Sequence, residues 1–219
     1  MNMPGPSAAQ EKLLSALSPS LRALALRGTI RSYRKNAVIV NEGEVGDSLF
    51  VLLQGRCKVF SNDAEGREIT YNVVEAGDYF GEMWLDGGPR SASVMTLEPC
   101  TCSVVGRAAL REHLAEEPEF ALDLVAQVIR RARAATETAR NMALLDVYGR
   151  VIVTLESTQG SARPGEPIML TQITHQNIAS RVGASREMVS RLLKDLEKGG
   201  YIELGVKRIT LLKKLPARW

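Results

Sequence analysis

The stretch TQITHQNIASRVGASREMVSRLLKDLEKGGYIEL, residues 171–204, carries the most specific pattern in the chain. Thr174 has the side chain of a helix N-cap, and the apolar Ile178 and Val182 follow at the spacing of one inward helix face. Gly183 then ends this short helix in a tight turn. The stretch therefore begins with a short, capped helix and a glycine turn.

A second, longer helix follows this turn. Ser185 is its predicted N-cap, and the helix covers residues 186 to about 198, where Gly199 and Gly200 stop it. Its buried face comprises Val189, Leu192, Leu193 and Leu196. Its polar residues are Arg186, Glu187, Ser190, Arg191 and Lys194. Two helices joined in this way predict a helix-turn-helix, and residues 201–212 predict a β-hairpin wing behind it.

The chemistry of the second helix suits DNA. An arginine can donate two hydrogen bonds to O6 and N7 of guanine, and a glutamate can accept one from N4 of cytosine. Helix N-termini and other basic side chains can hold phosphates. Residues 148–219 carry 12 Lys and Arg against 6 Asp and Glu, whereas residues 1–147 carry 16 against 19, which agrees with a polyanionic partner. DNA binding is favoured over the alternative, a helical hairpin for protein contacts.

From residue 29 to about residue 105 the signals are those of β-strands. Short runs rich in Val, Ile, Tyr and Phe alternate with glycines, and turn signals recur about every eight to twelve residues, which predicts an antiparallel barrel or sandwich. The predicted strand runs are residues 38–40, 49–53, 57–60, 69–74, 93–96 and 101–105. Residues 62–68 predict a hairpin tip, and residues 8–26 predict a helical stretch with a new turn at Pro19.

A long helix follows the strands, and Pro118 suits its first turn. Its apolar or small residues recur at alternating spacings of four and three, which predicts a coiled-coil seam between two copies of the chain. The seam residues are Ala121, Val125, Val128, Ala132, Ala135, Ala139 and Met142. The alternative is an amphipathic helix that lies on its own barrel through Leu122, Leu124 and Ile129.

The segment after the long helix predicts a change of direction. Residues 148–149 are expected to break that helix, and residues 150–156 predict another one. Residues 157–167 are polar and rich in glycine and proline, which predicts a loop within the second domain.

The loop GEMWLDGGPRSASV, residues 81–94, has one carboxylate near its start, Glu82, and one guanidinium near its end, Arg90. A carboxylate accepts hydrogen bonds from hydroxyls, and a guanidinium fork can neutralise a phosphate through two parallel hydrogen bonds. The two charges thus fit a ligand that carries hydroxyls and a phosphate. The alternative is a structural Glu–Arg pair that closes the loop.

The order of these parts resembles the cyclic AMP receptor protein and fumarate-nitrate regulator (CRP/FNR) family of bacterial transcription factors. The motifs FGEMWLDGGPRSAS and VGASREMVSRLLKDLE anchor the resemblance over about residues 10–215, and LLDVYGR, residues 144–150, is similar to the family's interdomain hinge. The resemblance implies an α+β chain with a jelly-roll-like, antiparallel β-roll for cyclic nucleotides over residues 1–115. A dimerisation helix and hinge over residues 116–147 and a winged helix-turn-helix over residues 148–219 would follow. It also implies a homodimer that meets RNA polymerase.

The resemblance implies roles for individual residues. In cyclic-nucleotide members the glutamate binds the ribose 2′-hydroxyl, and the arginine and the next serine bind the phosphate with help from backbone amides. The implied effector-binding residues are Gly81, Glu82, Met83, Arg90, Ser91, Ala92 and Thr136. The implied DNA-binding residues are Thr174, His175, Gln176, Ser185, Arg186, Glu187, Ser190 and Arg191.

The implied DNA target is a palindrome with TGTGA-like half-sites. Arg186, Glu187 and Arg191 match the family's base-reading residues, and Ser185 matches a phosphate contact. His175 stands where the family often has arginine. Two recognition helices related by a dyad need half-sites about one helical turn, roughly 34 Å, apart.

Two departures from the family bear on the effector. Trp84 stands next to the expected pocket, where nucleotide-binding members usually have a small residue. Ala135 stands where a threonine usually meets the adenine, which leaves Thr136 as the nearest hydroxyl and Thr138 as another. Cyclic AMP is slightly favoured, and cyclic di-GMP, whose guanines would stack on an indole, is close behind. Another small molecule or no effector is the remaining alternative.

Other kinds of chemistry find little support. The three cysteines, Cys57, Cys100 and Cys102, cannot supply the family's iron–sulfur cluster, and Cys100 and Cys102 are expected to be packing or partly exposed thiols rather than redox sensors. The two histidines, His113 and His175, are too few and too scattered for a metal or haem site. The sequence has no nucleophile–base–orienter set and no phosphate loop, so a β-roll enzyme or a nucleotide-gated regulatory subunit without specific DNA binding is the weaker alternative. Apolar runs are too short to span a membrane, and the cysteine usage favours the cytoplasm.

Overall fold

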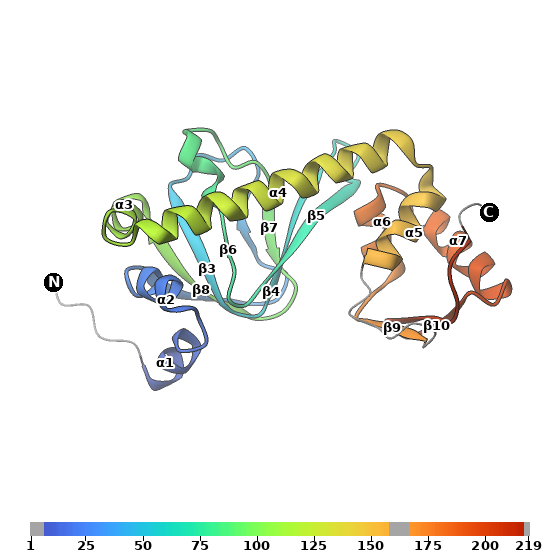
Figure 1. The fold of residues 1–219 in the computed structure, drawn as a ribbon, viewed down its shortest axis with the longest axis horizontal. Coiled ribbons are helices and arrows are strands. Elements are labelled where there is room, and N and C mark those ends of the chain that lie inside the picture. Colours follow the sequence, from blue (N-terminus) through green and yellow to red (C-terminus); the bar gives the residue numbers. More distant parts are fainter. Residues whose placement is uncertain (1–6, 158–166, 217–219) are drawn as a thin grey trace. The chain divides into compact units, whose positions relative to one another are not determined.

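The computed structural model describes residues 7–157 and 167–216, and Figure 1 shows its elements. The chain divides into two compact units. The first contains the described residues up to 61 together with 71–131, and the second contains residues 62–70 and the described residues from 132 onward. The long helix α4 (Pro118–Leu144) contributes residues to both.

Two four-stranded sheets form a β-roll in the first unit. One sheet has the strand order β1-β8-β3-β6 and the other has the order β2-β7-β4-β5; the pairs β1–β8, β3–β8 and β4–β7 are antiparallel. The strands are β1 (Thr29–Tyr33), β2 (Val38–Val40), β3 (Ser48–Gln54), β4 (Arg56–Asn62), β5 (Glu68–Glu75), β6 (Tyr79–Phe80), β7 (Ser93–Thr96) and β8 (Cys100–Gly106). Every strand run predicted from the sequence lies within one of these strands.

Three helices pack against β3 and β8 of the roll. They are α1 (Ala8–Leu14), α2 (Pro19–Leu26) and α3 (Arg107–Glu116). The helical stretch predicted over residues 8–26 is thus two helices, because Pro19 starts α2 in its first turn. Helix α3 was not predicted. The loop predicted over residues 81–94 contains a short 3₁₀ helix, η1 (Glu82–Asp86).

Strand β3 shows how the layers of the roll are built. All of residues 49–53 are buried, because a packed layer lies on each face of the strand. The odd-numbered side chains lie in one apolar cluster with Leu14 of α1 and Leu24 of α2. The even-numbered side chains lie in another cluster with Val94 of β7 and Cys57 of β4. The side chains of this continuous apolar run therefore pack alternately into the two clusters.

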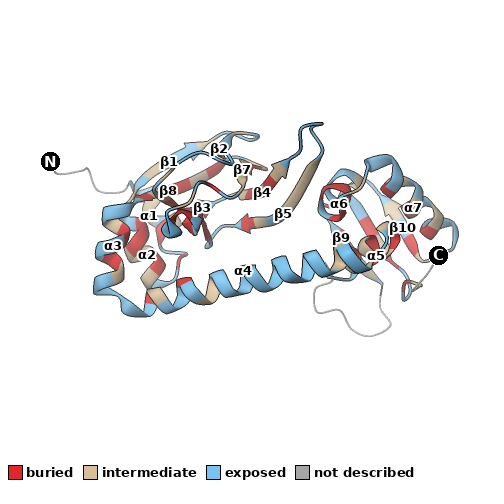
Figure 2. Ribbon diagram, turned by 90° about the horizontal axis from the view of Figure 1, so that it is seen from above, coloured by how far each residue is buried: buried red, intermediate tan, exposed pale blue. Residues whose placement is uncertain are grey.

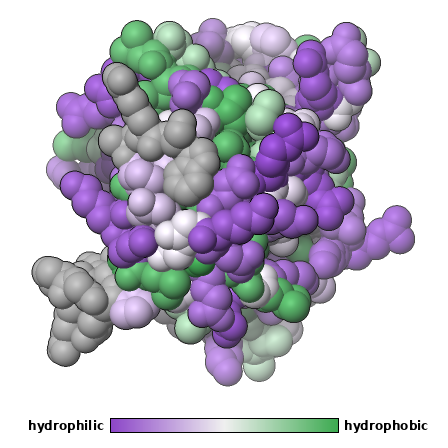
Figure 3. Space-filling view, turned by 90° about the vertical axis from the view of Figure 1, so that its right-hand side faces the viewer, coloured by the Kyte–Doolittle hydropathy of each residue, from purple (hydrophilic) through white to green (hydrophobic). Residues whose placement is uncertain are grey.

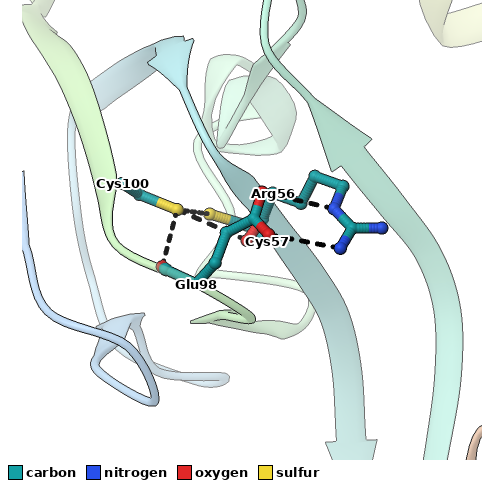
Figure 4. Close-up of polar contacts among 4 residues, drawn as sticks. All are labelled: Arg56, Cys57, Glu98 and Cys100. Carbon is teal, nitrogen blue, oxygen red and sulfur yellow. Dashed lines mark hydrogen bonds and ion pairs between the residues drawn. The ribbon is translucent and has the colours of Figure 1, made fainter. Parts of the chain in front are cut away.

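Two cysteines meet in the core between the sheets. The Sγ atoms of Cys57 on β4 and Cys100 on β8 are 3.7 Å apart, and both thiols are free (Figure 4). Beside them, Arg56 donates hydrogen bonds of 3.3 and 3.2 Å to the carboxylate of Glu98. Burial, helped by the neighbouring Cys100, raises the pKa of the Cys57 thiol. A protonated, buried thiol fits the packing role expected for Cys100, and Cys57 shares it.

The long helix predicted from the sequence is α4, and Figure 2 shows it exposed along most of its length. Phe120 and Leu124 are its buried residues and join the apolar cluster on the helix side of the roll. Its exposed large apolar residues are Leu122, Val125, Val128, Ile129 and Leu144. Of the three residues named in the alternative of a helix lying on its own barrel, Leu124 is buried against the roll, whereas Leu122 and Ile129 are exposed.

The break after α4 lies earlier than predicted. Helix α4 ends at Leu144 and α5 (Val147–Ser157) follows, so the break falls at Leu145 and Asp146. The Asp146 carboxylate accepts a hydrogen bond of 2.7 Å from the backbone N–H of Gly149 and thereby caps α5. The loop predicted over residues 157–167 lies, apart from its two ends, outside the described residues.

The second unit combines helices with a small antiparallel sheet. Its elements after α5 are β9 (Ile168–Thr171), α6 (His175–Val182), α7 (Arg186–Lys198), β10 (Ile202–Gly205) and β11 (Arg208–Leu211). The sheet order is β10-β11-β9, so the predicted hairpin wing is β10–β11 and β9 is an additional strand. Ile178 and Val182 are buried as predicted, and Gly183 has the left-handed φ of 61° that the turn between α6 and α7 requires.

Candidate functional site

The carboxylate of Glu82 is buried in the first unit and carries an ion pair. Glu82 is the first residue of η1, and it is 2% exposed. Its Oε1 atom accepts a hydrogen bond from Nη1 of Arg131 on α4, while Nη2 of Arg131 donates to the carbonyl oxygen of Tyr79 at 2.6 Å. The Oε2 atom of Glu82 has no hydrogen-bond partner among the described residues. This oxygen can accept a hydrogen bond from a ligand hydroxyl.

Arg131 was not identified from the sequence as a site residue, although a signal was present. Arg131 follows Leu124 by seven residues, which is about two helical turns, so the two side chains leave α4 on the same face. Leu124 is buried in the core of the roll, so Arg131 also faces the roll.

The guanidinium of Arg90 is folded back onto backbone carbonyls. Arg90 is 7% exposed, and it donates to the carbonyl oxygen of Gly81 at 2.6 Å and to that of Ser48 at 2.9 Å. Gly81 has a φ of 87°, and a Cβ atom there would lie 2.9 Å from Nη1 of Arg90. A glycine at this position therefore provides both the turn and the space for the guanidinium.

Glu82 and Arg90 take different partners. Because Glu82 pairs with Arg131 and Arg90 bonds to two carbonyl groups, a direct Glu82–Arg90 pair does not close the loop among the described residues. Burial lowers the pKa of the Arg90 guanidinium, and the carboxylates of Asp47, Glu82 and Glu44 oppose this shift. An arginine keeps its charge at neutral pH, so the loop offers a carboxylate oxygen and a cation as separate groups.

The other predicted effector residues differ in their accessibility. Met83 and Ser91 are exposed, and Ala92 is half-buried. Thr136 is exposed, and its hydroxyl donates to the carbonyl oxygen of Ala132 in its own helix at 3.0 Å. The ligand contacts expected of these residues stay predictions.

Trp84 corrects one expectation about the pocket. The sequence suggested an indole next to the ligand, but Trp84 is 2% exposed and lies in the apolar cluster under the helices of the roll. The guanidinium of Arg107 lies 4.6 Å from the centre of the indole ring. An indole enclosed in this way offers no face on which a guanine can stack.

In the second unit, α7 presents the polar surface expected of a recognition helix. A hollow on this surface is lined by Arg186, Glu187, Ser190, Arg191 and Lys194. The opposite face of α7 buries Val189, Leu193 and Leu196, while the fourth predicted core residue, Leu192, is half-buried. Figure 3, seen from the side of Figure 1 on which α7 lies, shows mostly hydrophilic side chains. The hollow brings together four of the predicted DNA-binding residues, together with Lys194.

The remaining predicted DNA-binding residues lie at helix starts, where they bond to the protein. Thr174 accepts from the N–H of Asn177 at 3.1 Å, and Ser185 accepts from the N–H of Met188 at 3.2 Å. Both are the N-caps predicted from the sequence. His175 contacts Ser190 of α7 through Nδ1, which lies 2.8 Å from Oγ. Gln176 donates a long hydrogen bond of 3.5 Å to Ser180.

Arg150 connects the break after α4 to the helix-turn-helix. Its Nε atom donates to the carbonyl oxygen of Val182, the last residue of α6, at 2.9 Å. Its Nη1 atom donates to the carbonyl oxygen of Leu145 at 2.8 Å. One side chain thus satisfies carbonyl groups at a helix end and at the break, where both would otherwise lack partners.

Two kinds of feature are absent from the described residues. Within residues 7–157 and 167–216, no helix is long and apolar enough to cross a membrane. The same residues contain no group of three or more His, Cys, Asp or Glu that could hold a metal ion.

Comparison with known proteins agrees with this geometry. The model of the cyclic nucleotide-binding domain matches residues 30–117, and the model of the Crp-like helix-turn-helix domain matches residues 149–215. A ligand-binding roll followed by a winged helix-turn-helix defines the class as a cyclic-nucleotide-binding, DNA-binding transcription regulator.

Sequence similarity to known regulators narrows this class to one family. The chain is 32% identical to the cAMP-activated global transcriptional regulator CRP of Shigella flexneri over 88% of this chain and 94% of that protein. It is 31% identical to the CRP-like cAMP-activated global transcriptional regulator of Mycobacterium tuberculosis over 82% of each. The chain belongs to the CRP/FNR family of transcription regulators.

Solved structures share the fold. The c-di-GMP responsive regulator CLP of Xanthomonas campestris has a TM-score of 0.78 at 22% identity and covers 89% of this chain and 98% of its own. A CRP/FNR-family regulator of Thermus thermophilus has a TM-score of 0.68 at 24% identity over 84% of this chain and 94% of its own. The named relatives are transcription regulators rather than enzymes.

Proposed function

We propose that the chain acts as a homodimer that binds a palindromic, TGTGA-like operator in double-stranded DNA under the control of a cyclic nucleotide. Cyclic AMP is the favoured effector, ahead of cyclic di-GMP. The observation that carries the proposal is the exposed face of α7, on which Arg186, Glu187 and Arg191 line one hollow while the opposite face is buried. RNA polymerase is the expected further partner, and the cytoplasm is the expected compartment.

The α7 face supports base reading because its charged groups are of the kinds that distinguish base pairs. Arg186 and Arg191 carry guanidinium forks for guanine, and Glu187 carries an acceptor for cytosine N4. Polar residues at this face and at the helix starts beside it are proposed to hold phosphates and so fix the register of the protein on the duplex. They are Ser185, Thr174, His175, Gln176 and Ser190.

The roll is proposed to bind a nucleotide because the carboxylate of Glu82 matches a ribose hydroxyl and the guanidinium of Arg90 matches a phosphate. The buried Oε2 atom of Glu82, which has no hydrogen-bond partner among the described residues, is proposed to accept from the ribose 2′-hydroxyl. Arg90 is proposed to exchange its two carbonyl acceptors for phosphate oxygens, a change that replaces neutral acceptors by a charged one. Ser91 and the backbone near Gly81, Met83 and Ala92 would complete the phosphate site, and Thr136 is the proposed contact to the base.

Cyclic AMP is favoured over cyclic di-GMP for two reasons. The relatives that are 31–32% identical are described as cAMP-activated. The burial of Trp84 also removes the stacking surface that made cyclic di-GMP attractive. The likeness to the c-di-GMP responsive protein, at 22% identity, bears on the fold alone.

The homodimer is proposed to form along α4, with residues 116–147 as the dimerisation helix and hinge. The exposed Val125 and Val128, followed by exposed alanines, form an apolar seam along this helix. Arg131 of the same helix is bonded to Glu82, so a nucleotide at Glu82 would act directly on the helix that carries the seam. Control then requires a different nucleotide affinity in the DNA-competent and incompetent states.

Two measurements on the purified chain test the proposal. Calorimetry with cyclic AMP, cyclic GMP and cyclic di-GMP should give saturable binding, strongest for cyclic AMP. Fluorescence anisotropy should show a preference for a duplex with two inverted TGTGA half-sites, one helical turn apart, over a scrambled duplex of equal length, and the effector should change that affinity. Equal binding to both duplexes, with and without nucleotide, would contradict the proposal.

A further inference from the structure

One contact on the proposed DNA-binding face joins the two helices of the helix-turn-helix through a titratable side chain. His175 is the first residue of α6, and its Nδ1 atom lies 2.8 Å from Oγ of Ser190 on α7. Both residues are half-buried. Since Ser190 also lines the hollow on α7, the imidazole of His175 lies beside that hollow.

The surroundings of His175 are positively charged. Burial lowers the pKa of the His175 imidazole, and the cations Arg186 and Lys194 on α7 lower it further. Glu187 also lines the hollow, but the charged groups that act on the ring are these two cations. The imidazole is therefore neutral in the free protein at neutral pH, because its usual pKa is about 6.5.

The Ser190 hydroxyl can serve either protonation state of the ring. A hydroxyl both donates and accepts hydrogen bonds. With a neutral ring, Ser190 donates to Nδ1, which leaves the proton on Nε2. With an imidazolium, Nδ1–H donates to Oγ and Nε2–H stays a donor. In both states Nε2–H can be offered to an anion, and in the second state the ring carries a full charge.

We propose that His175 makes DNA binding by this protein sensitive to pH, because the ring takes up a proton when a DNA phosphate approaches the face formed by α6 and α7. This inference rests on the proposed DNA-binding function and adds its regulation. A phosphate near the ring favours the charged form, and it also screens the repulsion from Arg186 and Lys194. Proton uptake is therefore linked to binding.

The direction of the pH effect follows from this linkage. The pKa of His175 is lower in the free protein than in the complex, so binding takes up protons between the two values. DNA affinity then rises as the pH falls, and the gain is complete below the pKa of His175 in the free protein. This gain is lost as the pH rises through the pKa of His175 in the complex. Each unit by which DNA raises the pKa gives about a tenfold gain in affinity for each bound protomer.

The test uses the full chain, the inverted TGTGA duplex and the scrambled duplex, between pH 5.5 and 8.0. His175→Gln removes the titration, and His175→Arg fixes the charge. The wild type should gain affinity toward acid pH more steeply than both variants, on either duplex, because a phosphate contact does not depend on base sequence. At pH 5.5 the plot of the logarithm of DNA affinity against the logarithm of salt concentration should be steeper for the wild type than for His175→Gln. The difference in slope should be about 0.9 for each protomer. Equal pH dependence of wild type and His175→Gln would overturn the inference.

A second measurement follows the titration of His175 directly in the wild-type protein. The chain has two histidines, so the imidazole Cε1–H resonances can be followed by NMR, with His175→Gln used only for assignment. The His175 resonance should titrate at higher pH in the DNA complex than in the free protein, and an unchanged midpoint would overturn the inference. Failure of the proposed function is distinguishable, because it would appear as equal affinity for the two duplexes at every pH. The comparison of slopes on either duplex would still decide the role of His175.

Discussion

Arg131 on α4 forms an ion pair with Glu82 on η1, so the long exposed helix is bonded to the carboxylate of the candidate effector site. The same guanidinium holds the carbonyl oxygen of Tyr79, the residue that begins β6. A ligand hydroxyl that binds Glu82 therefore meets a carboxylate whose position is set by α4. This contact links the candidate effector site to the helix proposed to form the dimer.

Arg131→Gln should destabilise the roll by about 1–3 kcal/mol, because Glu82 would remain buried without its cation. Urea unfolding followed by circular dichroism measures the change. The matched control is Arg133→Gln, since Arg133 is an exposed arginine of the same helix. The double variant Arg131→Gln with Glu82→Gln should recover part of the loss. An equal effect of both single variants would show that the ion pair contributes nothing specific.

Arg90→Leu should weaken the binding of cyclic AMP by at least about tenfold, because charge-assisted hydrogen bonds to phosphate are lost. Isothermal calorimetry measures the affinity, and a thermal melt checks that the roll is still folded. Arg90→Lys keeps the charge but removes the fork, so it should fall between the wild type and the leucine variant. Unchanged affinity in a folded Arg90→Leu protein would remove Arg90 from the site.

Arg186→Ala should relax the preference at one base pair of each half-site and cost about 1–3 kcal/mol there. Competition binding with single-substituted duplexes measures this preference. Lys194→Ala is the comparison, because a lysine that meets phosphates should weaken binding to all duplexes alike and lower the salt dependence. If both variants shifted all duplexes equally, Arg186 would not be a base reader.

Ala135→Asp should dissociate the dimer, because it places a desolvated carboxylate in the apolar seam of α4. Ala134→Asp is the matched control, since both alanines are exposed in the single chain and Ala134 lies off the seam. Sedimentation velocity should give a monomer for the first variant and a dimer for the second. A dimer in both cases would place the interface elsewhere.

His113→Leu should flatten the acid dependence of the stability of the roll. His113 is fully buried against Phe120, and neither ring nitrogen has a partner among the described residues. Burial is the main cause that lowers the pKa of the His113 imidazole, and the charge of Arg27 lowers it further. The carboxylates of Glu117 and Glu116 oppose this shift. The stability it contributes is thus present above the unfolded pKa of about 6.5 and is lost as the pH falls toward the lower folded value.

Thermal melts between pH 5 and 8 measure this difference. The wild type should lose stability below about pH 6.5 more steeply than His113→Leu, because the unfolded chain binds a proton that the folded roll excludes. The leucine variant should be as stable as the wild type, or more stable, at pH 8, because it removes unpartnered polar atoms. Parallel stability curves would show that His113 does not contribute to the acid response.

The helix-turn-helix was predicted closely because its signals are local. Thr174 and Ser185 cap the helices that follow them through hydrogen bonds over three residues, and Gly183 adopts the left-handed turn that its position indicated. The strand runs were found for the same reason, since alternation and turns act between near neighbours. Asp146 also acts locally, and its carboxylate, three residues before Gly149, was the signal that would have placed the break correctly.

The sequence by itself determined the capped helices, the strands and the identity of the charged groups, because backbone geometry and side-chain chemistry are encoded over a few neighbouring residues. Only the tertiary structure decided that Trp84 is enclosed in the core, that Arg131 reaches Glu82 and that His175 meets Ser190. These contacts join residues far apart in the chain or on different elements. They depend on how whole layers pack, because burial and electrostatic pairing are properties of the assembled fold. The seven-residue spacing from Leu124 indicates the face of α4 on which Arg131 lies, but not its partner.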